Sequence, residues 1–279
     1  MEQTEEMVDE IIYPSITFKI EGDIYAISSK YVKTIMQMPK YKKIPNANPI
    51  ISGVFMLRDL TVPMLDLRKA FGVKTVDDEC REFAENLEKR KDDHINWITE
   101  LKRCTSAGEK FTLTTDPHQC AFGRWYDKYE SNHNIVNAHL NQILLPHEKL
   151  HKSAEIIEEC IKNGEHDKAR EVLEKAENRY MPRILQLIEE TESIYREAYR
   201  QMVLVLSDDE NTLGVVVDEV VSVENLSDAG GEKAIREFNN TNYIDGIKLS
   251  EKTNEIVIGL DDKKILGLAE NFDANKPMI

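Results

Sequence analysis

The sequence predicts an α+β protein of several domains, in which a β domain is split by an inserted antiparallel four-helix bundle. Short runs rich in Val and Ile, with turn signals between them, occupy both ends of the chain. From about residue 78 to 200, Gly and Pro become rare and apolar residues recur at helical spacing. Because a bundle with adjacent ends can occupy a loop without breaking its host, we expect one β domain in two pieces. The expected segments are an acidic tail (1–14), a first β part (15–74), the helical bundle (78–200) and a second β part (201–279).

The composition argues against several classes of function. The 279 residues include 36 Lys and Arg against 51 Asp and Glu, which gives a net charge of −15. Such acidity argues against nucleic-acid binding and against electrostatic attachment to anionic lipid. No apolar run approaches the roughly 20 residues that cross a bilayer, and the acidic N-terminus lacks a signal-peptide core. We therefore expect a cytoplasmic protein without direct membrane insertion, whose four scattered cysteines are thiols.

The β parts are predicted from alternation and turn residues. Ile16, Phe18 and Ile20 alternate with polar neighbours, as in a half-buried strand. Two later runs, 54–57 and 62–67, flank the polar pair Arg58-Asp59, which predicts a turn. Pro63 predicts that the second run is an edge strand or a strand start, because proline cannot donate to a ladder. Runs at 203–206, 213–218 and 255–260 supply strands of the second part.

Three of the seven histidines lie on apolar helical stripes, where a core residue is expected. His147 and His151 are one turn apart and share a face, and His94 lies on the first helix of the bundle. Cys120 falls in the first turn of a helix predicted to begin at Asp116-Pro117, where free amides favour the thiolate. Three imidazoles and a thiolate form a tetrahedral set suited to Zn²⁺. The alternative is that the histidines are hydrogen-bonded core residues.

The remaining histidines and cysteines fit a metal set less well. His118 is two residues from Cys120 and is expected to point elsewhere, and His133 lies in a polar turn. His139 flanks the apolar stripe and is the best substitute ligand. We interpret Cys80, Cys104 and Cys160 as small apolar residues.

A competing motif is the run from His147 to His151, which matches the H-E-x-x-H pattern of zinc proteases. In that chemistry Glu148 would be the general base, and one metal position would stay open for water. The match is short, and Pro146 indicates a helix start or kink rather than the middle of an active-site helix. If Cys120 is a fourth ligand, no water position remains, so we expect a protein that is not an enzyme.

Three separated motifs in the helical segment resemble the chemoreceptor zinc-binding (CZB) domain. They are an early H-x-x-W (His94 to Trp97), a central C-x-[LF]-G-x-W (Cys120 to Trp125) and a late H-x-x-x-H (His147 to His151). The resemblance implies that His94, Cys120, His147 and His151 are zinc ligands. It also implies a domain that reports zinc availability or oxidants that attack Cys120.

The flanking segments resemble the CheW adaptor, notably ITFKIEGDIYAIS, IPNANPIISGVFMLRDLTVPMLDLRKAFG and VLVLSDDENTLGVVVDEVVSVENLS. The resemblance implies two small five-stranded β-barrels that couple chemoreceptors to the histidine kinase CheA in cytoplasmic signalling arrays. It assigns partner binding to Arg58, in a turn where Asp59 replaces the family's glycine. That replacement puts in doubt a turn that needs a positive φ at Asp59. The sequence leaves self-association open.

Overall fold

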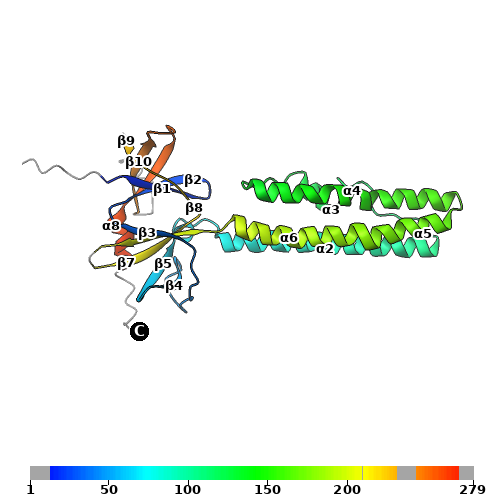
Figure 1. Cartoon of the computed structure of the whole chain (residues 1–279), viewed down its shortest axis with the longest axis horizontal. Helices are drawn as coiled ribbons and strands as arrows, with labels where there is room; N and C mark the ends of the chain where they lie inside the picture. The colour runs from blue at the N-terminus through cyan, green and yellow to red at the C-terminus, as the bar shows by residue number, and fades with distance from the viewer. Residues whose placement is uncertain (1–12, 209, 231–242, 270–279) are drawn as a thin grey trace, which may run out of the picture. The chain divides into compact units, whose positions relative to one another are not determined.

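The structure, a computed structural model, describes residues 13–208, 210–230 and 243–269. Most of the acidic tail expected at 1–14 therefore lies outside the described residues. The chain divides into two compact units, one formed by Met1–Thr75 with Arg200–Ile279 and the other by Val76–Tyr199. The first unit contains two mixed sheets, and the second is helical (Figure 1). The expected α+β class is confirmed.

One sheet of the first unit has the strand order β8-β1-β2-β11-β10-β9. Neighbouring strands are antiparallel except β11 and β2, which run parallel. The strands are β1 (Ser15–Ile20), β2 (Asp23–Ser28), β8 (Glu219–Glu224), β9 (Leu226–Gly230), β10 (Ile244–Ser250) and β11 (Ile256–Leu260).

The second sheet has the order β3-β6-β7-β5-β4, with β5 and β7 parallel. Its strands are β3 (Val32–Gln37), β4 (Ile51–Leu57), β5 (Leu60–Asp66), β6 (Met202–Ser207) and β7 (Thr212–Val217). Two short helices, α1 (Leu67–Ala70) and α8 (Asp262–Gly267), complete the unit. Each sheet combines strands from before and after the helical segment, so neither β part could form its sheets alone.

Pro63 is not in an edge strand or at a strand start, which corrects the expectation from the sequence. It lies inside β5, which has β7 on one side and β4 on the other. Pro63 is opposite Val54 of β4, and the parallel pairing of β5 with β7 begins only at Met64. The missing N–H therefore costs the ladder nothing on the β7 side.

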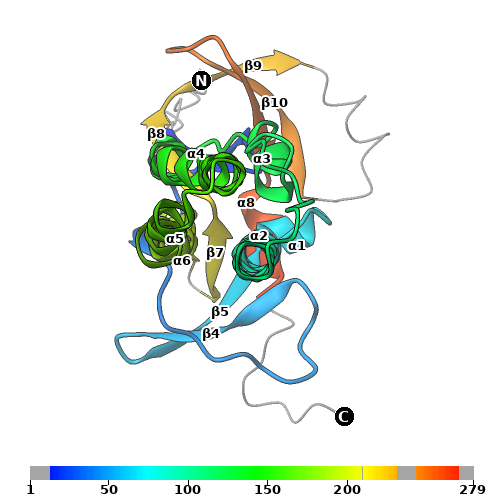
Figure 2. The same cartoon turned by 90° about the vertical axis from the view of Figure 1, so that its right-hand side faces the viewer.

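The helical unit contains long helices that run alongside one another (Figure 1). Figure 2, which looks along them, shows the short helix α3 beside α4 and across from α5 and α6. None of the helices in the described residues is long and apolar enough to cross a membrane. The elements are α2 (Val76–Ala107), α3 (Ala121–Tyr126), α4 (Asn134–Lys162), α5 (His166–Lys175), the π-helical turn η1 (Ala176–Tyr180) and α6 (Met181–Ala198).

Two details of the helices differ from the sequence prediction. Helix α3 does not begin at Asp116-Pro117; Asp116 Oδ1 instead accepts a hydrogen bond from the His118 amide, which closes a turn, and Cys120 is the N-cap. Pro146 neither starts nor interrupts α4, which continues through it to Lys162. That helix ends as predicted, with Gly164 in the left-handed conformation at φ +75°.

A buried ion pair marks the place where the chain leaves and rejoins the β unit. Arg68 is 3% exposed, and its Nε donates to Asp218 Oδ1 at 2.8 Å while its Nη1 donates to the Lys74 carbonyl at 2.7 Å. The Gln201 amide also donates to Asp218, at 3.2 Å. We call Arg68, Lys74, Gln201 and Asp218 the junction cluster. It ties together the residues that precede α2 and follow α6.

We predict that Asp218→Asn lowers the free energy of unfolding of the β unit by about 3 kcal/mol, because it removes the carboxylate that pairs with the buried Arg68 guanidinium at 2.8 Å. Circular dichroism during urea unfolding should show the loss. Both tryptophans lie in the helical unit, so their fluorescence should not shift. Glu219→Gln, in the exposed pair with Lys19, is the control and should cost about 0.5 kcal/mol or less. An equal effect of the two substitutions would contradict the role of the junction cluster.

Candidate metal centre

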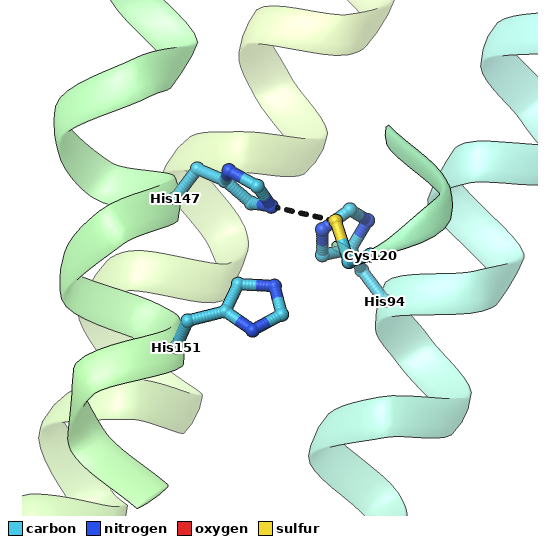
Figure 3. Close-up of side chains that lie close together, drawn as sticks. All are labelled: His94, Cys120, His147 and His151. Atoms are coloured by element: carbon cyan, nitrogen blue, oxygen red, sulfur yellow. Dashed lines mark hydrogen bonds between the residues drawn. The ribbon is translucent and has the colours of Figure 1, made fainter. Parts of the chain in front are cut away.

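The structure brings together all four residues that the sequence nominated as ligands. His147 and His151 project from α4, His94 from α2, and Cys120 from the start of α3, and their side chains converge in Figure 3. One potential ligand atom from each residue lies within 4.8 Å of the others. We call these four residues the metal cluster. The sequence spacing could predict the pair on α4, but the meeting of three separate segments is a result of the fold.

Local structure explains how each side chain reaches the centre. His94, His147 and His151 are at most 2% exposed, as their places on apolar stripes predict. Cys120 caps α3, and its Sγ accepts a hydrogen bond from the Gly123 amide at 3.2 Å. A side chain at Gly123 would collide with the Pro117 carbonyl, since an added Cβ would lie 1.9 Å from that oxygen. Only glycine therefore allows this tight approach of the turn to the helix.

Hydrogen bonds to the main chain determine which imidazole nitrogens can bind a metal. His94 Nδ1 donates to the Arg90 carbonyl at 2.6 Å, and His151 Nδ1 donates to the Thr114 carbonyl at 3.3 Å. A carbonyl oxygen only accepts, so both Nδ1 atoms carry the proton and both Nε2 atoms carry a lone pair. These two Nε2 atoms are buried and have no hydrogen-bond partner within the described residues. The Nε2 of His147 lies 3.2 Å from Cys120 Sγ, as the dashed line in Figure 3 marks.

Aromatic rings hold the imidazoles in place. Phe122 is fully buried and packs edge-on against His147 and His94, with ring centroids 5.0 and 5.9 Å apart. On the other side, Trp97 lies 4.8 Å from His151, and its Nε1 donates to the same Thr114 carbonyl at 2.9 Å. The rings therefore restrict the rotamers of the metal cluster before any cation binds.

Burial keeps the cluster uncharged at neutral pH in the metal-free protein. Burial lowers the pKa of His147 to about 2, with the nearby His94 and His151 adding to the effect, and lowers the pKa of His151 to about 4. Burial also lowers the pKa of His94. For Cys120, burial raises the thiol pKa more than the Gly123 and Phe122 amides lower it. The expected helix-start effect on Cys120 is therefore present but is outweighed.

The donor set fits a tetrahedral zinc ion. Zn–N bonds of about 2.0–2.1 Å and Zn–S bonds of about 2.3 Å place the nitrogen and sulfur ligand atoms of a tetrahedral site about 3.3–3.6 Å apart. The donor atoms are already within 4.8 Å, so a contraction of about an ångström would close the shell. The Nε2 lone pairs of His94 and His151, which are buried and without a partner among the described residues, are the observation that favours a cation here over a set of core histidines. Imidazole and thiolate together are the ligands that zinc prefers.

The other nominated residues lie outside the cluster. His118 is exposed and contacts Asp127 at 3.1 Å, and the His133 ring packs against Tyr199. His139 is buried on α4 and lies 3.5 Å from Glu190, so it is not a substitute ligand. Glu148, which would be the general base if the H-E-x-x-H motif formed a protease site, is exposed on α4 and is not part of the cluster. Cys80, Cys104 and Cys160 are buried thiols.

Sequence reasoning missed the groups that orient the imidazoles. The acceptors for His94 and His151 are main-chain oxygens of Arg90 and Thr114. Every residue carries a carbonyl, so no residue type could have signalled them. Trp97 of the early motif gave a partial indication of such an acceptor, because a buried indole N–H needs a hydrogen-bond acceptor. In the structure that acceptor is the Thr114 carbonyl, which also accepts from His151.

Arg58, the expected partner-binding residue, lies at the turn between β4 and β5 in the other unit. It is exposed and adopts φ +53°, whereas Asp59 does not have a positive φ. The doubt raised by Asp59 in place of glycine is therefore resolved, because the left-handed residue is Arg58. Met56 and Leu60 beside it are 62% and 59% exposed, so the turn presents a cation between two apolar side chains.

Two family models match the chain. The CheW-like domain matches residues 14–89, and the chemoreceptor zinc-binding domain matches residues 94–157. The chain therefore contains a CheW-like domain followed by a member of a zinc-binding domain family, and both resemblances expected from the motifs are confirmed. The second match includes all four residues of the metal cluster.

One curated relative agrees with the first match. The chemotaxis protein CheW of Bacillus subtilis (strain 168) is 33% identical over 87 residues, which are 30% of this chain and 54% of the relative. The chain thus spans about half the length of this curated relative. The crystal structure of the scaffolding protein TtCheW from Thermoanaerobacter tengcongensis is 10% identical, covers 90% of both chains and has a TM-score of 0.38.

We predict that acid destabilises the metal-free helical unit. In the unfolded chain the imidazoles take up protons near pH 6.5. In the folded protein, His151 takes up its proton only near pH 4 and His147 only near pH 2. Stability is therefore unaffected above pH 6.5 and falls below it, by up to about 1.4 kcal/mol per pH unit for each imidazole. Urea unfolding followed by tryptophan fluorescence measures the slope. His147→Asn should reduce it, and an unchanged slope in that variant would contradict the assignment.

We predict that the Cys120 thiol loses its proton when Zn²⁺ binds, and that the imidazoles, already neutral, lose none. Calorimetry at about pH 7 in buffers of different ionisation enthalpy should detect about one proton released per zinc. Cys120→Ala should bind zinc more weakly with release near zero. Equal proton release by the two proteins would show that Cys120 is not a ligand.

Proposed function

We propose that this chain is a non-enzymatic chemotaxis adaptor that couples chemoreceptors to the histidine kinase CheA and carries its own zinc-dependent sensor. The observation that carries the proposal is the buried metal cluster in a helical unit inserted into a CheW-like chain. In this proposal the protein works on the cytoplasmic side, in receptor arrays. The two sheets would correspond to the two barrels of CheW-like proteins, and the inserted unit to the zinc-binding bundle.

The interleaved sheets support the adaptor part of the proposal. The segment that the CheW-like model matches supplies β1 to β5, and these pair with strands that follow the helical unit. The parallel pairs β5–β7 and β2–β11 join the two segments into one unit. Arg58 would contact the partner from its exposed turn, because a left-handed arginine between two exposed apolar side chains is costly for a turn that has no ligand.

Zinc would be held by Nε2 of His94, His147 and His151 and by Sγ of Cys120. When bound, the ion would supply a positive charge that stabilises the Cys120 thiolate and closes a four-ligand shell. With four protein ligands and an exposed Glu148, the arrangement favours a closed site over the hydrolytic one that the H-E-x-x-H motif allows.

The exposure of the cysteines supports a redox input. Cys120 is half-buried, whereas Cys80, Cys104 and Cys160 are buried. A two-electron oxidant that reaches the helical unit would therefore meet Cys120 first and convert its thiolate to a sulfenate. The sulfenate would be a weaker and differently shaped ligand, so oxidation and zinc loss would both release the start of α3.

A chain of aromatic contacts provides the route from the metal cluster to the end of α6. Phe122 packs against two of the three cluster imidazoles, those of His94 and His147, and against Trp125, whose ring lies 6.1 Å from that of Phe83. Phe83 stacks on Tyr195 at 3.9 Å, and Tyr195 stacks on Tyr199 at 4.4 Å. Tyr199 directly follows α6, three residues before β6. Different packing of α3 would therefore change the packing at the end of α6.

We predict that removal of zinc changes the affinity of the full chain for CheA or for a chemoreceptor cytoplasmic fragment by about fivefold or more, the low end of usual coupling between sites. Titration calorimetry with zinc-loaded and chelator-treated protein measures the difference. Cys120→Ala should behave alike in both states. Arg58→Ala should weaken partner binding in both states without changing the zinc affinity.

Matched controls separate the sensor from its alternatives. Cys160→Ala removes a buried thiol of α4 outside the cluster and should keep the response to zinc and to oxidant. Glu148→Gln should leave zinc binding unchanged. If zinc removal lowers the melting temperature but leaves both partner affinities unaltered, the metal is purely structural and the sensing proposal is wrong.

A further inference from the structure

A second cavity in the helical unit lies apart from the metal cluster. Its volume is about 280 Å³, and it opens where the end of α2, the chain that follows it and the last turns of α4 meet. An apolar cavity of about 150 Å³ is large enough to hold benzene, so this one has room for a longer alkyl chain or a double ring. Its wall is apolar and is formed by Leu101, Phe111, Ala154, Ile157 and Ile161.

Within the described ranges, one charged side chain at the mouth of the cavity lacks a partner of opposite charge. Glu109 pairs with Arg103 at 2.7 Å, and Lys162 pairs with Glu158 at 3.2 Å. Among the described residues, the Lys110 ammonium at the same mouth has neither a hydrogen bond nor an ion pair. An apolar wall beneath a free cation matches an amphiphile with a single carboxylate.

The chain between α2 and α3 connects this cavity to the metal cluster. Phe111, in the cavity wall, packs edge-on against Trp97 at 5.1 Å, and Trp97 packs against His151 at 4.8 Å. Three residues further on, the Thr114 carbonyl accepts hydrogen bonds from both Trp97 and His151. One short segment thus forms a wall of the cavity and fixes the orientation of a cluster imidazole.

We propose that this cavity is a regulatory site for a small amphiphilic monocarboxylate, which places its apolar part against Phe111 and Ala154 and its carboxylate at Lys110. Occupancy holds the segment around Phe111 and Thr114 in place and so holds His151 in its ligand orientation. The bound carboxylate therefore raises the affinity of the metal cluster for zinc, and zinc raises the affinity for the carboxylate by the same factor. The second part rests on the proposed function, because it takes the cluster to bind zinc.

The first experiment titrates octanoate into the metal-free full chain and follows binding by calorimetry and by tryptophan fluorescence. Octanoate should bind at one site and more tightly than octanol. Lys110→Met should weaken octanoate binding about three- to fivefold and leave octanol binding unchanged, because it removes one exposed charge contact. Lys162→Met is the matched control and should have a smaller effect, because Lys162 already has a partner in Glu158.

A cavity-filling variant tests the location. Ala154→Phe should weaken octanoate binding at least tenfold, because the larger side chain occupies the apolar space. Lys110→Met changes an exposed residue and remains informative if Ala154→Phe does not fold. Absence of octanoate binding at millimolar concentration, equal binding of octanol, or no effect of Lys110→Met would overturn the site.

The second experiment measures zinc affinity against a chromophoric chelator with and without saturating octanoate. The zinc affinity should rise about three- to tenfold, and the rise should disappear in Lys110→Met. An unchanged zinc affinity would overturn the regulatory role. Failure of the chain to bind zinc at all, with octanoate still bound, would instead refute the proposed function, so the two failures are distinguishable.

Discussion

Two buried nitrogen lone pairs, which meet no hydrogen-bond donor in the part of the chain that the structure describes, determine the chemistry of the metal cluster. The Nε2 atoms of His94 and His151 lie in an apolar interior because their Nδ1 protons are already bound to main-chain oxygens. Leaving such acceptors unsatisfied is costly, and protonating them is opposed by the same burial that lowers their pKa. A bound cation would satisfy both lone pairs, and its binding energy would then be part of the folding energy of helices α2, α3 and α4.

The sequence predicted features that depend on periodicity and missed those that depend on individual backbone geometry. The apolar stripes predicted the long helices and the shared face of His147 and His151. Cys120 was predicted to lie in the first turn of a helix, but it is the N-cap residue that precedes α3. The helix begins later than predicted because Asp116 uses its carboxylate for a local turn rather than for a helix cap. The left-handed φ at Arg58 and the one-sided pairing of Pro63 also depend on backbone geometry that side-chain types do not reveal. The role of the four cluster residues as ligands stays a prediction, since the structure establishes their proximity alone.

The interleaved sheets place a physical demand on the inserted unit. The parallel pairs join residues such as Met64 and Gly214, which are distant in sequence, and the closure of a long flexible loop costs conformational entropy. A folded helical unit whose ends lie together shortens that loop to the few residues that flank it. The helical contacts are largely local and the sheet contacts are not, so stability of the insert supports pairing in its host.

The junction cluster has a consequence for how such a chain can change over evolution. Arg68 donates a hydrogen bond to Lys74, just before the helical unit, and Asp218 accepts one from Gln201, just after it. The two chain segments that connect the units are therefore linked through the Arg68–Asp218 ion pair. Whatever lies between them can be exchanged without rebuilding either sheet, provided that its two ends emerge side by side. During evolution, a different domain or a short loop could therefore replace the helical unit between Lys74 and Gln201. The two sheets and the exposed turn at Arg58 would stay unchanged.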